Sequence, residues 1–296
     1  MEVPVGLLCC EVEKIRRSYR DPVLLNDRVL NNLLCSEEKY TLSSDYFTII
    51  QTDLKPYMRK MVADWMLEVC EEQQCEQDVF PLAMNYMDRF LAVCKLGRNQ
   101  LQLLGAACMF LASKLKETSP LTAEKLIIYT DKSISYQQLL DIEVLILKRL
   151  KWDLSAITPH DFLEQVIHRL PIKADYAHLI RKHAQTLIAM CVTDYSFAMY
   201  PPSMIAAGCV GAAVNGLSSG VRRYDEIPNL MNRLYEITKI ELEYLHQCQE
   251  QIEHLLSKNL SSGNQQEEML KQDDKEAPST PTDIQDISDL LNIASA

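Results

Sequence analysis

Residues 56–117 carry three helical patterns in succession, and this stretch constrains the fold more than any other part of the chain. It reads PYMRKMVADWMLEVCEEQQCEQDVFPLAMNYMDRFLAVCKLGRNQLQLLGAACMFLASKLKE. In the first pattern the apolar residues recur at the spacing of one helix face, namely Met58, Met61, Val62, Trp65, Met66 and Val69. No comparable alternation of apolar and polar residues predicts a strand. We therefore expect an all-α protein.

Two segments, Leu101–Lys114 and Ser203–Val214, are apolar on every side and rich in small residues. A helix of this kind has to be surrounded by other helices. Each segment follows an amphipathic pattern, at Pro81–Cys94 and at Tyr176–Val192 respectively, and each is followed by two more helical patterns. The sequence therefore predicts two helical bundles of the same architecture, connected by Lys151–Ala156.

Prolines mark the expected helix starts, because the first helical position has no intrahelical hydrogen bond to lose. The prolines that precede helical patterns are Pro22, Pro56, Pro81, Pro120, Pro159 and Pro202. Ser135 followed by Gln138 predicts a capping box, and Thr158 predicts an N-cap. An outlying helix is expected at Asp21–Leu34, before the first bundle.

The composition excludes several classes of function. The net charge of −11 argues against direct binding of nucleic acid, and the presence of only eight glycines argues against phosphate-binding loops. The ten cysteines form no CxxC pair and the histidines form no metal motif, so we expect free thiols, no metal and no cofactor. The longest apolar runs, Leu103–Ala112 and Met204–Val214, are too short to cross a membrane. Polar residues dominate after Leu256, which predicts a disordered acidic tail over residues 257–296.

Seven stretches of the chain resemble the cyclins, and specifically the D-type cyclins: MRKMVADWMLEVCEE, VFPLAMNYMDRFL, LQLLGAACMFLASKLKE, PLTAEKLIIYTD, LKRLKWDLSAITPHDF, IRKHAQT and PPSMIAAG. The likeness covers roughly residues 7–256. It implies two consecutive five-helix cyclin boxes, at residues 55–153 and 154–256, after an N-terminal segment (residues 1–20) and a helix with a linker (residues 21–54). It also implies a regulatory subunit that activates a cyclin-dependent kinase and is not itself an enzyme.

Glu143 places a carboxylate on an apolar helix stripe, where it needs a partner because burying it alone is costly. Its helical neighbours are Leu139, Leu140, Ile146 and Leu147. Lys114 closes the first wholly apolar helix. Spacing alone favours a structural role, in which Lys114 complements its helix C-terminus and Glu143 pairs inside the fold. The resemblance instead implies that both residues bind the backbone of the kinase.

A second candidate surface lies along the helix after Pro56. Its residues resemble the hydrophobic docking patch by which cyclins receive basic-x-leucine motifs of substrates and of kinase inhibitors, and a carboxylate beside an apolar groove suits such a ligand. The residues are Met58, Met61, Val62, Trp65 and Glu68, with Leu101 and Gln102 opposite. The helical spacing of the apolar members fits a place in the core equally well.

The N-terminal segment contains Leu7, Cys9 and Glu11 as Leu-x-Cys-x-Glu. In an extended chain these three side chains point to one side, because successive residues alternate. D-type cyclins and some viral proteins share this motif for binding retinoblastoma-family proteins, and the resemblance implies the same role here. The alternative is an apolar turn that docks on the body of the protein.

Thr280 precedes Pro281 in the tail and resembles the family's phosphorylation-triggered degradation signal, which implies recognition by a ubiquitin ligase. Phosphate adds nearly two negative charges to such a site. The chain departs from the usual family ending because it continues through Leu290 and Leu291 to Ala296. This extension leaves open how the local signal is read.

Taken together, the sequence predicts a D-type cyclin of the nucleus and cytoplasm. We expect it to bind a cyclin-dependent kinase catalytic subunit, retinoblastoma-family proteins, kinase inhibitors and a ubiquitin ligase, and to promote entry into S phase. One alternative is a cyclin-box transcription factor, which would be expected to carry a basic face, or a cyclin-box adaptor that does not activate a kinase. Another is an all-α enzyme, for which no nucleophile and base are evident in the sequence.

Overall fold

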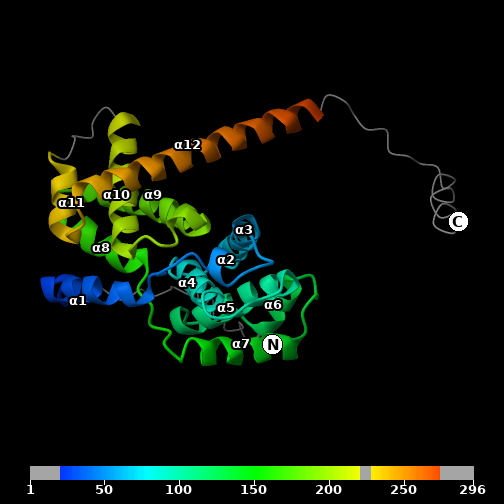
Figure 1. Ribbon diagram of the computed structural model, residues 1–296. Helices are drawn as coiled ribbons and strands as arrows, with labels where there is room; N and C mark the ends of the chain where they lie inside the picture. Colours follow the sequence, from blue (N-terminus) through cyan, green and yellow to red (C-terminus); the bar gives the residue numbers. More distant parts are fainter. Residues whose placement is uncertain (1–20, 221–227, 274–296) are drawn as a thin grey trace, which may run out of the picture.

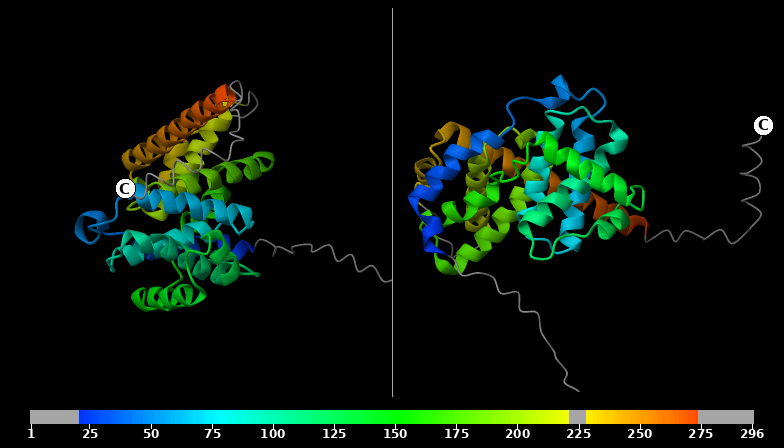
Figure 2. Two further views of the ribbon diagram at one scale, coloured as in Figure 1. Left: turned by 90° about the vertical axis from the view of Figure 1, so that its right-hand side faces the viewer. Right: turned by 90° about the horizontal axis from the view of Figure 1, so that it is seen from below.

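The computed structural model describes residues 21–220 and 228–273, and every regular element within these two ranges is a helix. The predicted all-α class is therefore confirmed for the described part of the chain. Figure 1 shows two helical bundles side by side, and the view from below in Figure 2 separates them clearly.

Each bundle contains five α-helices. The first bundle is formed by α3 (Pro56–Glu72), α4 (Val79–Leu91), α5 (Leu101–Lys116), α6 (Ala123–Tyr129) and α7 (Tyr136–Arg149). The second is formed by α8 (Pro159–Arg169), α9 (Ala174–Thr193), α10 (Pro202–Gly220), α11 (Leu230–Thr238) and α12 (Leu242–Asp273). Two short helices precede them, α1 (Asp27–Glu37) and α2 (Tyr46–Ile49).

The two wholly apolar segments form the central helices, as predicted. Helix α5 packs against α3, α4, α6 and α7, and α10 packs against α8, α9, α11 and α12. A glycine in each central helix allows a close approach. A Cβ on Gly105 would lie 2.8 Å from Cγ1 of Val62 in α3, and one on Gly208 would lie 2.8 Å from Cδ1 of Ile252 in α12. The second bundle therefore repeats the packing of the first, and the two bundles are called the first and the second box below.

Most of the predicted helix boundaries agree with the structure. Ser135 and Gln138 form the expected capping box, and Asp161 accepts a hydrogen bond from the backbone N–H of Thr158 at the start of α8. Pro81, however, lies inside the first turn of α4 rather than at its start. Proline is tolerated there because the first N–H groups of a helix have no intrahelical acceptor.

Two other helices start later than predicted, and one helix ends later than predicted. Pro22 opens a short 3₁₀ turn, so α1 begins only at Asp27. Pro120 is followed by a loop, and Thr122 caps α6. At the other end, α12 continues to Asp273, past Leu256, where we expected order to end. The sequence QQEEMLKQ in this part consists of good helix formers, which propagate a helix that tertiary packing has already started.

Helix α1 packs against the second box rather than the first, and it lies beneath α8 in Figure 1. Arg169 of α8 donates to the backbone carbonyl of Leu25 and to the carboxylate of Asp27, both at 2.9 Å. At the other end of α1, Glu37 accepts hydrogen bonds from N–H and Oγ of Ser203, at 2.8 and 2.7 Å, in the first turn of α10. Burial raises the pKa of the Glu37 carboxyl, although these two hydrogen bonds partly oppose the effect.

A buried ion pair joins the two boxes. The Arg59 guanidinium in α3 binds both carboxylate oxygens of Asp88 in α4, at 2.8 and 2.7 Å. It also donates to the backbone carbonyls of Val192 and Thr193, at 3.1 and 2.8 Å, where α9 of the second box ends. The Tyr46 hydroxyl donates to Asp88 at 2.8 Å. The Arg59 side chain thus bridges α3, α4 and α9.

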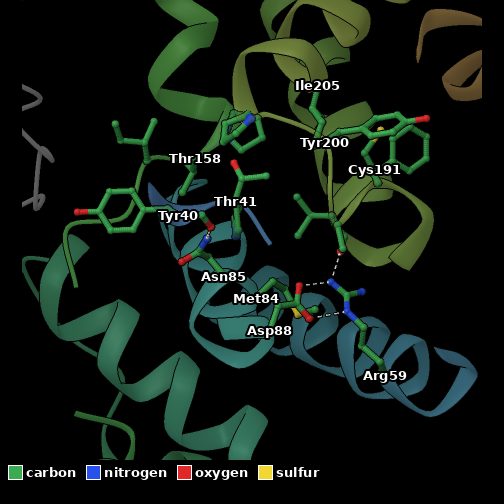
Figure 3. Close-up of a pocket in the computed structure, with 17 residues that line it drawn as sticks. Tyr40, Thr41, Arg59, Met84, Asn85, Asp88, Thr158, Cys191, Tyr200 and Ile205 are labelled. Carbon is green, nitrogen blue, oxygen red and sulfur yellow. Dashed lines mark hydrogen bonds and ion pairs between the residues drawn. The ribbon is translucent and has the colours of Figure 1, made fainter. Parts of the chain in front are cut away.

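Figure 3 shows the ion pair at the edge of a small pocket between the boxes, with dashed lines from Arg59 to Asp88. Arg59 is 2% exposed and Asp88 is 7% exposed. Burial by itself would lower the pKa of Arg59, but the Asp88 carboxylate outweighs it and raises the pKa of the guanidinium. The guanidinium therefore stays charged although it is withdrawn from water, so removing either partner is costly.

We expect Arg59→Met to destabilise the chain by about 3–5 kcal/mol, because it leaves the Asp88 carboxyl group buried without its guanidinium partner. The neighbouring Lys60 forms an exposed pair with Asp64 at 3.2 Å, so Lys60→Met should cost less than about 1 kcal/mol. Urea unfolding followed by circular dichroism measures both. Equal losses in the two variants would contradict the role assigned to Arg59.

Candidate functional site

The structure brings Lys114 and Glu143 together on the first box. Lys114 lies in the last turn of α5 and Glu143 in the middle of α7, and Nζ of Lys114 lies 2.6 Å from Oε1 of Glu143. The Lys114 side chain is 42% exposed and that of Glu143 is 11% exposed. The carboxylate therefore has the partner that its apolar surroundings require, while the ammonium remains accessible from solvent.

Aromatic and aliphatic groups surround this pair. Nζ of Lys114 lies 3.6 Å from the centre of the Phe110 ring, a cation–π geometry that holds the ammonium against α5. Leu115, the next residue, is 50% exposed. A cation and an anion set among apolar groups can bind main-chain carbonyl and N–H groups of a partner that covers them. The predicted kinase-binding role of Lys114 and Glu143 stays a prediction at this point.

The predicted docking patch forms a partly exposed strip on α3. Met61 is 66% exposed, which excludes a place in the core for this one residue, whereas the other apolar members pack against the core. Met58, Val62 and Trp65 are half-buried, and Glu68 is exposed. The strip therefore combines apolar surface with a carboxylate, as a basic-plus-leucine ligand requires, and its docking role remains a prediction.

The two remaining residues of the predicted patch, Leu101 and Gln102, lie at the start of α5. Leu101 is 3% exposed, and Gln102 is half-buried. Helices α3 and α5 are held in contact because Gly105 leaves room for Val62. Leu101 therefore belongs to the core and is not part of the surface of the patch.

Sequence reasoning missed Arg59 and Asp88. The available signal was helical spacing, because Arg59 shares a face with Ala63, Met66 and Cys70, which are buried. The apolar stripe read from the sequence is rotated relative to this buried face, since Met61 belongs to the stripe and is exposed. A charged residue on the face that is buried indicates an ion pair, but its partner is 29 residues away in the chain.

Several predicted residues lie outside the described part of the chain. These are Leu7, Cys9 and Glu11 of the N-terminal motif and Thr280 of the tail. Among the residues whose side chains the structure describes, no three His, Cys, Asp or Glu come together as a metal site. Within residues 21–220 and 228–273 no helix combines the length and the apolar character that a membrane crossing requires.

Two family models match the chain. The model described as "Cyclin, N-terminal domain" matches residues 28–155, and the model described as "Cyclin, C-terminal domain" matches residues 157–279. The change from one model to the other falls between α7 and α8, where the first bundle ends and the second begins.

Curated relatives are similar over nearly the whole chain. The G1/S-specific cyclin-D2 of Xenopus laevis is 55% identical over 95% of this chain and 99% of the relative. The G1/S-specific cyclin-D1 of Danio rerio is 52% identical over 95% of this chain and 98% of the relative. Among solved structures, a viral cyclin from herpesvirus saimiri superposes with a TM-score of 0.68 and 27% identity, over 78% of this chain and 97% of that chain.

The two matching domain models, the paired five-helix boxes and the extent of identity all indicate the same assignment. The chain belongs to the cyclin family and, within it, to the G1/S-specific D-type cyclins, which are regulatory subunits of cyclin-dependent kinases and have no catalytic activity of their own.

Proposed function

We propose that this cyclin uses Lys114 and Glu143 to hold its kinase in the active conformation, directs that kinase to retinoblastoma-family proteins and so promotes entry into S phase. The observation that carries the proposal is the half-exposed ion pair between α5 and α7, with 2.6 Å between Nζ and Oε1. An ammonium has three donors and a carboxylate about four acceptor positions. Each group can therefore keep its internal partner and still bind backbone groups of the kinase.

The mechanism is a shift of population in the kinase. A protein kinase is active only when the glutamate of its αC helix meets the lysine of strand β3. A cyclin that makes contacts only with this arrangement stabilises it by the difference between its affinities for the two states. The packing of α5 against four other helices of the first box supports this role, because it determines where the backbone of Lys114 lies.

The exposed strip on α3 is proposed to recruit substrates and kinase inhibitors. Met61 and Trp65 offer apolar surface, and Glu68 offers a carboxylate for a basic residue. An extended ligand with a basic residue followed by leucine can satisfy both. Because this strip and the Lys114–Glu143 pair contain different residues, one cyclin can hold its kinase and a substrate at the same time.

The two terminal motifs extend the proposal. Leu7, Cys9 and Glu11 match the motif for retinoblastoma-family proteins, and Thr280 is proposed as the phosphorylated residue that a ubiquitin ligase reads. A proline-directed kinase can act on Thr280 because Pro281 follows it. We propose that the protein occurs in both the nucleus and the cytoplasm, in keeping with its proposed action on retinoblastoma-family proteins and its proposed degradation through a ubiquitin ligase.

Swapping the two charges tests the kinase-binding role. Lys114→Glu is expected to weaken binding of the kinase subunit by about 30-fold or more, because truncating or reversing one member of a buried charged contact costs about 2–5 kcal/mol. The double variant with Lys114→Glu and Glu143→Lys restores an internal pair but presents the wrong charge at each position. Calorimetric titration with the purified kinase subunit should therefore show weak binding for the double variant as well.

Circular dichroism serves as the control and should show the same helix content in both variants. Recovery of full kinase binding in the double variant would instead mean that the pair acts only within the fold.

The docking strip can be tested with a fluorescent basic-x-leucine peptide. We expect Met61→Asp to weaken binding of this peptide by about tenfold, because it places a charge on the apolar surface that the leucine covers. Ile128 on α6 is 65% exposed, close to the 66% of Met61, so Ile128→Asp is a matched control. Fluorescence anisotropy would contradict the assignment if both variants bound like the unmodified chain.

The N-terminal motif can be tested at two adjacent cysteines, one of which serves as the control. Cys9 is one of its three fixed residues, whereas Cys10 occupies a variable position. In an extended peptide the two side chains point to opposite sides, so Cys9→Asp should abolish capture by a retinoblastoma-family pocket domain and Cys10→Asp should not. Pull-down measures capture, and phosphorylation of a short peptide checks that the kinase is still activated. Equal capture by both variants would remove the motif from the site.

A further inference from the structure

The C-terminal end of α3 places two cysteines against each other. The N–H of Gln74 donates to the carbonyl of Glu71 at 3.0 Å, and the N–H of Cys75 donates to the carbonyl of Cys70 at 2.9 Å. Gln74 has a φ of 54°, in the left-handed region. These bonds define a Schellman motif, in which the side chains at the positions held here by Cys70 and Cys75 face each other.

The two thiols differ in ionisation and exposure. Interaction with the Cys70 side chain lowers the pKa of the Cys75 thiol. The same interaction, together with burial, raises the pKa of the Cys70 thiol, whose sulfur also lies 3.9 Å from Sδ of Met109. Cys75 is half-buried, whereas Cys70 is 6% exposed. A thiol that ionises readily and reaches solvent thus lies in front of one that stays protonated, which is the division of roles found in reactive cysteine pairs.

A cleft gives small molecules access to the pair. Cys70 and Cys75 both line a space of about 510 Å³ between the two boxes, together with Phe80 of α4, His160 of α8 and Met190 of α9. A second close pair, Cys191 and Cys209, has its sulfurs 3.8 Å apart, but both residues are 0% exposed. The Cys191–Cys209 pair therefore lacks the access to solvent that Cys75 has.

We propose that Cys70 and Cys75 form a redox site at which a peroxide generates a reversible intramolecular disulfide. The Cys75 thiolate attacks one oxygen of hydrogen peroxide, the O–O bond breaks, and a sulfenic acid forms at Cys75 while the leaving hydroxide takes up a proton to become water. The sulfur of Cys70 then attacks the sulfur of Cys75. The S–S bond forms, the S–O bond breaks, and the hydroxyl leaves as water with the Cys70 proton.

In total, two thiols and one peroxide give one disulfide and two waters, and two electrons pass from sulfur to the peroxide. A dithiol such as dithiothreitol reverses the step by thiol–disulfide exchange. Neither cysteine belongs to the Lys114–Glu143 pair or to the α3 strip, so the site consists of residues to which no other role is assigned.

Peptide mapping of the full chain tests the proposal. The purified protein is treated with hydrogen peroxide, alkylated with iodoacetamide and digested with trypsin without reduction. Cleavage after Lys60 and Arg89 gives peptide 61–89, whose only cysteines are Cys70 and Cys75. We expect this peptide to lose two hydrogens and to carry no alkyl group, and to return to the doubly alkylated form after dithiothreitol.

The chain supplies its own matched control. Cleavage after Lys182 and Arg222 gives peptide 183–222, which contains only Cys191 and Cys209. Because this pair is fully buried, peptide 183–222 should remain a dithiol and be alkylated only after unfolding. Bridging of peptide 61–89 should exceed that of peptide 183–222 by about tenfold or more at the same peroxide concentration.

Two variants identify the order of events. With Cys70→Ala the sulfenic acid at Cys75 has no resolving thiol, so dimedone should trap it on peptide 61–89. Cys35→Ala removes an exposed cysteine elsewhere and should leave the bridge unchanged. The proposal is overturned if peptide 61–89 stays doubly alkylated while Cys35 is oxidised, if the two peptides bridge equally, or if Cys70 or Cys75 pairs with another cysteine instead.

Discussion

The arrangement of the two cyclin boxes depends on one buried guanidinium. Arg59 binds both oxygens of Asp88 within the first box and two backbone carbonyls at the end of α9 in the second. The carbonyls that end a helix lack intrahelical donors, and Arg59 supplies donors for two of them. A charge in this position cannot be left without partners. The ion pair therefore fixes how the boxes meet, and with them the cleft that Cys70 and Cys75 line.

The proposed kinase-binding surface also follows from helix packing, here at the edge of the first box. Helix α5 is central and apolar, so its last turn is the first place where a charge can reach solvent, and Lys114 lies there. Glu143 is tolerated on the apolar side of α7 because α5 brings Lys114 to it. A regulatory subunit acts by contact alone, so surface charges held by a rigid interior are the features that it needs.

Local physics explains why much of the fold could be predicted from sequence. Helical spacing, proline positions and capping residues such as Ser135 depend on neighbours within a few residues, and these predictions agree with the helices observed. Errors arose where contacts between residues far apart in the chain determine the structure. The apolar stripe on α3 correctly predicted a helix but not which face of it is buried. Met61 belongs to the stripe and is exposed, whereas Arg59 lies outside the stripe and is buried. Helix α12 continues past Leu256 although its sequence becomes polar there.

The sequence by itself determined the helical class, the twofold repetition of a bundle with a central apolar helix, and the membership of a family, because these depend on short-range patterns. Only the tertiary structure decided which side of α3 faces water, that Glu143 meets Lys114, and that α1 rests on the second box. Each of these outcomes joins residues that are far apart in the chain. Their energies depend on burial and on partner geometry, which no local pattern encodes.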